Sequence, residues 1–132
     1  MGKIVNAHVH FGLPWGQSPH LDVSYTPETL LRDMDRGGVD MSIILPFIFN
    51  YDMEWHARCA REHPDRLIAY AMFNPWRHPA IKDDIRRWRD WGIRGIKLRA
   101  SNEAFNLNSF DLLTDCFETC QELNMILMVH TG

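Results

Sequence analysis

Two kinds of hydrophobic pattern alternate along this chain. Five short apolar runs predict β-strands: Ile4–His8, Met41–Leu45, Leu67–Phe73, Ile93–Leu98 and Met125–His130. Between these runs, apolar residues recur every three or four positions, which is typical of amphipathic helices that pack one face against a core. Strict alternation of strand and helix predicts an α/β fold with a parallel sheet and right-handed crossovers.

Capping and helix-breaking residues mark the boundaries of the helices. Thr26 is typical of an N-cap because Pro27 follows it at the first helical position, and Gly37 and Gly38 end that helix. Four helices are expected in all: from Pro27 to the Gly37-Gly38 stop, from about Asp52 to His63, from Pro79 to Trp91, and along the apolar stripe of Phe110, Leu113, Phe117 and Cys120.

The length limits which α/β architecture the chain can form. Its 132 residues fit one domain, 1–132, but fall short of the roughly 250 residues of a closed eight-stranded barrel. We therefore expect an incomplete TIM-type (β/α) barrel of five strands and four helices. A flavodoxin-like doubly wound sheet is the alternative fold. Against it, the chain ends on a strand, and no glycine-rich phosphate loop follows the first strand.

Histidines stand at the ends of the first and last strands. His8 and His10 are two positions apart, so a strand would present both imidazoles on one face, about 7 Å apart at the backbone. Two ring nitrogens can converge on a metal ion across that span. His130 ends the last apolar run, and α/β folds build their sites at the carboxyl ends of strands. These three histidines are the candidate metal ligands.

Strand alternation also predicts which other side chains face the histidines. Three sets share that face: Asn6 with His8 and His10, Gly95 with Lys97 and Arg99, and Ile126 with Met128 and His130. Lys97 is a candidate for holding an anionic group of a substrate or, if carbamylated, for bridging two metal ions. A structural ion pair with a carboxylate is the alternative role of Lys97. Arg99 is expected to be solvated at the mouth of the barrel.

Composition excludes several classes of partner. Lys and Arg total 14 against 17 Asp and Glu without a block of like charge, so no footprint for nucleic acid or an anionic membrane is present. No apolar run approaches the roughly 18 residues of a membrane span, and no signal-peptide pattern occurs. We therefore expect a cytoplasmic protein. Its three cysteines are expected to be reduced packing residues, and His56, His63 and His78 to have surface or packing roles.

Three segments together resemble the amidohydrolase superfamily, in particular its amidohydrolase-related branch of metal-dependent hydrolases and decarboxylases. They are Asn-Ala-His-Val-His-Phe-Gly (Asn6–Gly12), Gly-Ile-Arg-Gly-Ile-Lys-Leu (Gly92–Leu98) and Ile-Leu-Met-Val-His-Thr-Gly (Ile126–Gly132). The resemblance covers the whole chain but only the first half of the family's barrel.

The resemblance implies a divalent metal, usually zinc, bound by His8, His10 and His130. In the family, a further His after strand six and an Asp after strand eight complete the site, and this chain stops before both. Activated water would attack the carbonyl of a lactone, an amide or a related small substrate. Decarboxylation of a carboxylated aromatic or related acid is the alternative reaction. A non-catalytic fragment or binding module is the third possibility.

The long connection after the first strand is a candidate substrate pocket. Phe11, Trp15 and His20 could shape it for an aromatic or lactone-like substrate, or serve as local packing anchors.

The predicted topology also bears on assembly. A half-barrel leaves one face and both edges of its sheet uncovered, so we expect a homo-oligomer or a requirement for the missing C-terminal half.

Overall fold

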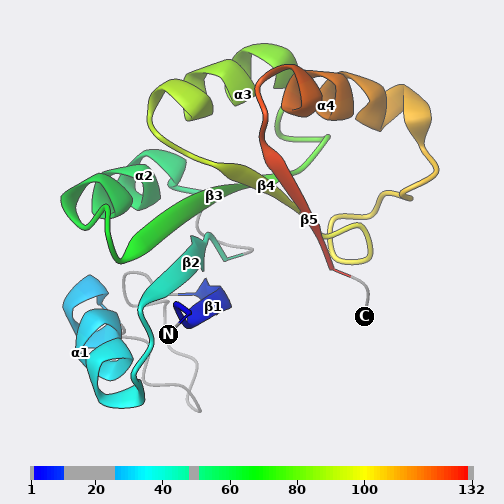
Figure 1. The fold of residues 1–132 in the computed structure, drawn as a ribbon. Coiled ribbons are helices and arrows are strands. Elements are labelled where there is room, and N and C mark those ends of the chain that lie inside the picture. Colours follow the sequence, from blue (N-terminus) through cyan, green and yellow to red (C-terminus); the bar gives the residue numbers. More distant parts are fainter. Residues whose placement is uncertain (1, 11–25, 48–50, 131–132) are drawn as a thin grey trace.

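The chain folds into one curved sheet covered by helices on one side (Figure 1). The computed structural model describes residues 2–10, 26–47 and 51–130. The strands are β1 (Val5–His10), β2 (Met41–Leu45), β3 (Leu67–Phe73), β4 (Gly95–Leu98) and β5 (Ile126–Val129). The helices are α1 (Pro27–Gly37), α2 (Met53–Glu62), α3 (Ile81–Asp90) and α4 (Phe110–Glu122).

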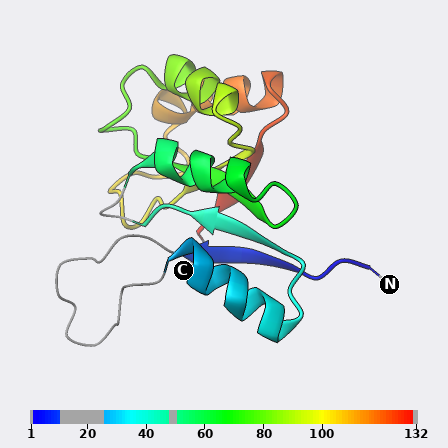
Figure 2. The same ribbon diagram turned by 90° about the vertical axis from the view of Figure 1, so that its left-hand side faces the viewer.

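All neighbouring strands pair in parallel, in the sequential order β1-β2-β3-β4-β5. Figure 1 shows all four helices on the convex side of the sheet, and in Figure 2 β1 and β2 run in the same direction with α1 alongside. A flavodoxin-like sheet would change direction at a switch point in its strand order. The predicted incomplete (β/α) barrel is therefore confirmed, and the doubly wound alternative is wrong.

The caps confirm the local signals for the first two helices. The Thr26 side chain accepts a hydrogen bond from the backbone N–H of Thr29, and Gly38 adopts the left-handed conformation, with φ 66°, that ends α1. Asp52 caps α2 in the same way by accepting from the N–H of Trp55. The third helix begins at Ile81 instead of the expected Pro79.

The strand β1 contains a β-bulge that the sequence pattern did not predict. Asn6 pairs with Ser42 and Val9 pairs with Ile44, so two residues of β1, Ala7 and His8, lie opposite the single residue Ile43 of β2. Paired residues of a parallel sheet share a face, and Ser42 and Ile44 share one face of β2. Asn6 therefore lies on the face of Val9, and its predicted place beside His8 and His10 is wrong. A bulge reverses the alternation locally and re-aims the side chains that follow it.

The core lies between the sheet and the helices. The helix-facing residues of the central strands are almost completely buried, among them Ile44, Ala71 and Ile96. The three cysteines are free and buried, which agrees with a packing role. Phe110 departs from its predicted apolar stripe because 66% of it is exposed.

The edge strands expose apolar side chains on the open sides of the sheet. Ile126 in β5 is 58% exposed, and Ile4, next to β1, is 56% exposed. On the concave face β3 contributes Tyr70 and Met72, which pair in register with Gly95 and Lys97. Within the described ranges, no helix is both long and apolar enough to cross a membrane.

Candidate functional site

The two histidines of β1 converge at the carboxyl end of the sheet. Their Nε2 atoms are 2.9 Å apart, and their rings meet nearly edge to face. His10 also uses Nδ1, which lies 3.1 Å from the carbonyl oxygen of Leu45. A carbonyl only accepts, so Nδ1 of His10 carries the proton, and the unprotonated Nε2 of His10 accepts the hydrogen bond from Nε2–H of His8. A backbone carbonyl that fixes the tautomer in this way is typical of metal-binding histidines.

The surroundings favour neutral imidazoles at both positions. Burial lowers the pKa of His8, and the positive charge of Lys97 lowers it further, with smaller contributions from other nearby cationic groups. Burial also lowers the pKa of His10, and the hydrogen bond to Leu45 opposes only part of that effect. Neutral imidazole is the form that binds a divalent metal.

A single ion would fit between these two rings. Two imidazole nitrogens that bind one ion at about 2.0–2.1 Å in tetrahedral geometry lie roughly 3.3 Å from each other. The Nε2 atoms of His8 and His10 are 2.9 Å apart, so the two rings would have to separate only slightly to hold one ion. The donor set and the fixed tautomer of His10 therefore suit a divalent cation.

His130 lies at the carboxyl end of the parallel strands, as His8 and His10 do. The three histidines do not, however, form a metal-binding triad. The backbone N–H of His130 donates to the carbonyl oxygen of Leu98 at 2.9 Å, which places this residue directly after β5 and beside the end of β4. The ring is close enough for its charge to lower the pKa of His8. In the part of the chain that the structure describes, no three His, Cys, Asp or Glu side chains are arranged to hold a metal.

Lys97 lies on the concave face of β4 with only 2% of its surface exposed. It pairs in register with Met72 on one side and Met128 on the other. Burial lowers the pKa of its ammonium group, and the charge of Arg99 adds to the effect. Among the described residues no carboxylate forms an ion pair with Lys97. The alternative of a structural ion pair therefore has no support here.

Arg99, which was expected to be solvated at the mouth of the barrel, is partly exposed and partly shielded. Its Nε and Nη1 atoms are shielded from solvent and meet no hydrogen-bond acceptor among the described residues. The guanidinium carbon lies 5.9 Å from the centre of the Phe47 ring. That same ring packs against His10 with 5.0 Å between ring centres. Phe47, just after β2, therefore connects Arg99 to the histidine pair.

Glu103 ties together the three connections that follow β2, β3 and β4. Its carboxylate accepts a 2.5 Å hydrogen bond from the Tyr51 hydroxyl and another from the side-chain amide of Asn74. Its backbone carbonyl accepts from the indole N–H of Trp76 at 2.9 Å. Burial, followed by the bond to Glu103, raises the pKa of Tyr51 to about 12. The network holds the connections that follow these three strands in one arrangement.

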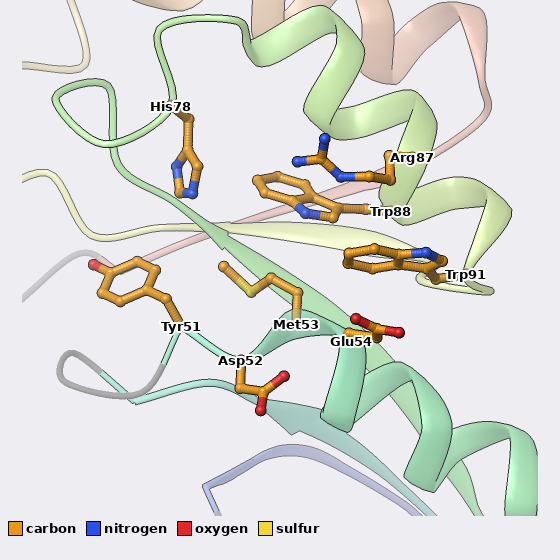
Figure 3. A pocket seen from close by; sticks show the side chains of 8 residues that line it. All are labelled: Tyr51, Asp52, Met53, Glu54, His78, Arg87, Trp88 and Trp91. Carbon is orange, nitrogen blue, oxygen red and sulfur yellow. The ribbon is translucent and has the colours of Figure 1, made fainter.

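A separate hollow of about 260 Å³ lies between α2 and α3 on the helix side of the sheet. Figure 3 shows its eight lining residues: Tyr51, Asp52, Met53, Glu54, His78, Arg87, Trp88 and Trp91. His78 packs edge to face on Trp88, in agreement with the packing role expected for it. Among the described residues that the sequence predicted for the site, namely His8, His10, Lys97 and His130, none lines this hollow.

The structure adds residues that sequence reasoning missed. Phe11, Trp15 and His20, the candidate pocket residues of the first loop, lie outside the described residues. Phe47 was missed, although it ends the apolar run that contains β2. Glu103 carries no local signal, because only the tertiary fold brings it to Tyr51 and Asn74.

Comparison with solved structures places this geometry in a known fold. A 5-carboxyvanillate decarboxylase from Novosphingobium aromaticivorans, complexed with manganese and 4-hydroxy-3-methoxy-5-nitrobenzoic acid, is 18% identical with a TM-score of 0.79; the match covers 99% of this chain and 51% of that one. A probable 2-pyrone-4,6-dicarboxylic acid hydrolase from Acinetobacter baumannii, with citric acid bound, is 15% identical with a TM-score of 0.76; the match covers 99% and 50%.

A third match is the 2,6-dihydroxybenzoate decarboxylase from Rhizobium, which is 17% identical with a TM-score of 0.77 over 100% of this chain and 50% of that chain. The present chain thus spans about half the length of the solved relatives that it matches. A search of curated proteins gives no match. The amidohydrolase family model matches residues 5–132, and the chain therefore belongs to the amidohydrolase family.

Proposed function

We propose that this chain provides the first half of a metal-dependent amidohydrolase site, with His8, His10 and His130 as ligands of one divalent cation. The observation that carries the proposal is the 2.9 Å approach of the Nε2 atoms of His8 and His10. His130 follows β5 at the carboxyl end of the strands, and its charge is near enough to lower the pKa of His8. Membership of the amidohydrolase family supports this assignment of the three histidines.

The reaction we favour is hydrolysis of a small substrate at a carbonyl group, such as a lactone or an amide. When bound, a divalent cation activates water and polarises the carbonyl. The chain itself orients His10 through the Leu45 carbonyl, and burial lowers the pKa of His10, which favours its neutral form. Lys97 would hold an anionic group of the substrate on the concave face. Zinc suits imidazole ligands, and manganese, the metal named for one solved relative, is the second candidate.

Decarboxylation of a carboxylated aromatic acid is the second candidate function. Two of the solved relatives described above are decarboxylases of such acids, and their fold matches this chain from end to end. In both reactions the remaining ligand and proton acceptor would come from the half of the barrel that this chain does not contain. We propose a cytoplasmic location for the protein as well.

Isothermal titration calorimetry with Zn²⁺ and with Mn²⁺ tests the proposed ligands. We expect binding by the wild-type chain, weaker than a complete site would give, and a sharp loss in each of His8→Ala, His10→Ala and His130→Ala. His63→Ala is the matched control, because this residue ends α2 away from the sheet edge. Unchanged affinity in the His8→Ala/His10→Ala double variant would reject the proposed site.

A further inference from the structure

We propose that the hollow between α2 and α3 binds a small quaternary ammonium ion, held between aromatic rings and two carboxylates. The hollow lies on the helix side of the sheet, and neither His8 nor His10 lines it, so this site is independent of the metal site proposed above. Its volume of about 260 Å³ lies just below the roughly 300 Å³ at which pockets for drug-sized ligands begin. The ligand should therefore be small.

The aromatic walls come mainly from α3 and its end. Trp88 lies in the last turns of α3, and Trp91 is the C-cap residue three positions later, so the two side chains are neighbours on one side of the helix. Figure 3 shows both indole rings on the α3 side of the hollow, across from Met53 of α2, with the Tyr51 ring at one end. The face of an aromatic ring attracts cations, and indole attracts them most strongly.

Two of these rings already contact cations of the chain itself. The guanidinium carbon of Arg77 lies 4.8 Å from the centre of the Tyr51 ring, and that of Arg87 lies 5.6 Å from the centre of the Trp91 ring. Both distances are within the limit of about 6 Å for a cation–π contact. Arg87 is itself a lining residue, so the hollow remains open with its guanidinium in place. The rings therefore suit a cation, and space for a second one is left beside them.

The basic groups of the lining add little positive charge. Arg87 forms an ion pair with Asp84, three residues earlier on α3, so its charge is compensated. The Nδ1 atom of His78 accepts a hydrogen bond from the backbone N–H of Asn74 at 3.1 Å. Burial lowers the pKa of His78, which favours the same neutral form of the ring.

Two carboxylates give the lining its negative charge. Asp52 and Glu54 lie at the start of α2, on the side of the hollow opposite the indole rings. Asp52 caps the helix by accepting from the backbone N–H of Trp55, so the N-terminus of α2 already holds an anion of its own. Glu54 is exposed and forms no ion pair with any basic residue in the described ranges. The lining therefore attracts a cation and repels an anion.

The aromatic walls favour a methylated ammonium ion over a primary one. A primary ammonium group carries three N–H donors, and each needs an acceptor when the group leaves water. Indole rings and a methionine side chain cannot supply three acceptors. A quaternary ammonium ion has no N–H donor and an apolar surface, and enclosure by aromatic rings is a recognised way to bind it.

Tetramethylammonium is a suitable probe, and tert-butanol is a neutral control of similar shape. NMR titrations that follow the indole N–H signals of Trp88 and Trp91 measure both affinities on the metal-free 132-residue chain at constant ionic strength. We expect tetramethylammonium to bind at least about tenfold more tightly than tert-butanol, and also more tightly than ammonium. Equal affinity for tetramethylammonium and tert-butanol, or no binding of tetramethylammonium, would overturn the proposal.

Variants of the lining test the two kinds of contact separately. Trp91→Leu should weaken tetramethylammonium binding about tenfold, and Trp91→Phe, which keeps a ring, should weaken it less. Glu54→Gln changes only an exposed side chain, so the fold should be kept, and binding should fall about threefold. Trp76→Leu and Glu62→Gln are the matched controls, because both residues are exposed and neither lines the hollow. Wild-type affinity in both Trp91→Leu and Glu54→Gln would show that the hollow is not the binding site.

Discussion

Replacing Glu103 by Gln should loosen the loops around the candidate site. The carboxylate accepts from both Tyr51 and Asn74, and Gln offers one acceptor oxygen and presents an N–H₂ group to the other donor. Hydrogen bonds to a charged group contribute about 1.5–3 kcal/mol each. Because solvent has partial access to Glu103, its hydrogen bonds should contribute at the lower end of this range. We therefore expect Glu103→Gln to lower the free energy of unfolding by about 2 kcal/mol.

Urea unfolding followed by tryptophan fluorescence measures this loss. A double-mutant cycle with Tyr51→Phe should give a coupling energy of about 1 kcal/mol, because the two side chains share one hydrogen bond. The matched control is Glu122→Gln, which removes only an exposed 3.3 Å ion pair with Arg86 and should cost less than about 0.5 kcal/mol. Equal losses for Glu103→Gln and Glu122→Gln, or zero coupling with Tyr51, would refute the role assigned to this network.

Three further predictions concern pH, packing and assembly. Tyr51 loses its proton near pH 10 in the unfolded chain but only near pH 12 in the folded one. Its stabilising contribution should therefore be present below pH 10 and disappear by pH 12. The difference in unfolding free energy between Tyr51→Phe and wild type should change only in that window. Gly95→Ala should destabilise the fold by about 1–3 kcal/mol in urea unfolding, because its Cβ would lie 2.6 Å from the Tyr70 ring and 2.8 Å from a backbone oxygen. The control Gly37→Ala, whose Cβ would have 3.8 Å of clearance, should be neutral or stabilising. Equal effects of the two substitutions would contradict the close packing of Gly95 against Tyr70. The exposed apolar edges of β1 and β5 should make the isolated chain self-associate or bind a hydrophobic dye, and a compact, dye-free monomer in sedimentation velocity would show that this expectation is wrong.

The fold could be predicted from the sequence because its signals are local and agree with one another. Thr26 and Gly38 bound the first helix, and the five apolar runs became the five strands with ends shifted by no more than two residues. The parity of β4 also placed Lys97 correctly on the concave face, where its register partners are Met72 and Met128.

The remaining features depend on tertiary contacts that no periodicity records. The bulge in β1 arises from pairing with β2, so the reversal at Asn6 had no signal in the sequence. The Phe47 ring that lies 5.9 Å from the guanidinium carbon of Arg99 comes from the end of another strand, and the partners of Glu103 come from loops 29 and 52 residues away. Sequence alone therefore found the candidate ligands but missed the residues that surround and support them.

The most direct test of the metal site is a crystal structure of the chain grown with Mn²⁺, whose anomalous scattering locates the ion. The account predicts one strong anomalous peak within about 2.2 Å of the Nε2 atoms of His8 and His10, with the His130 ring turned to join them. A peak elsewhere, or a His8–His10 pair that stays directly hydrogen-bonded with no ion at millimolar Mn²⁺, would contradict the claim that this sheet edge is half of a metal-dependent site.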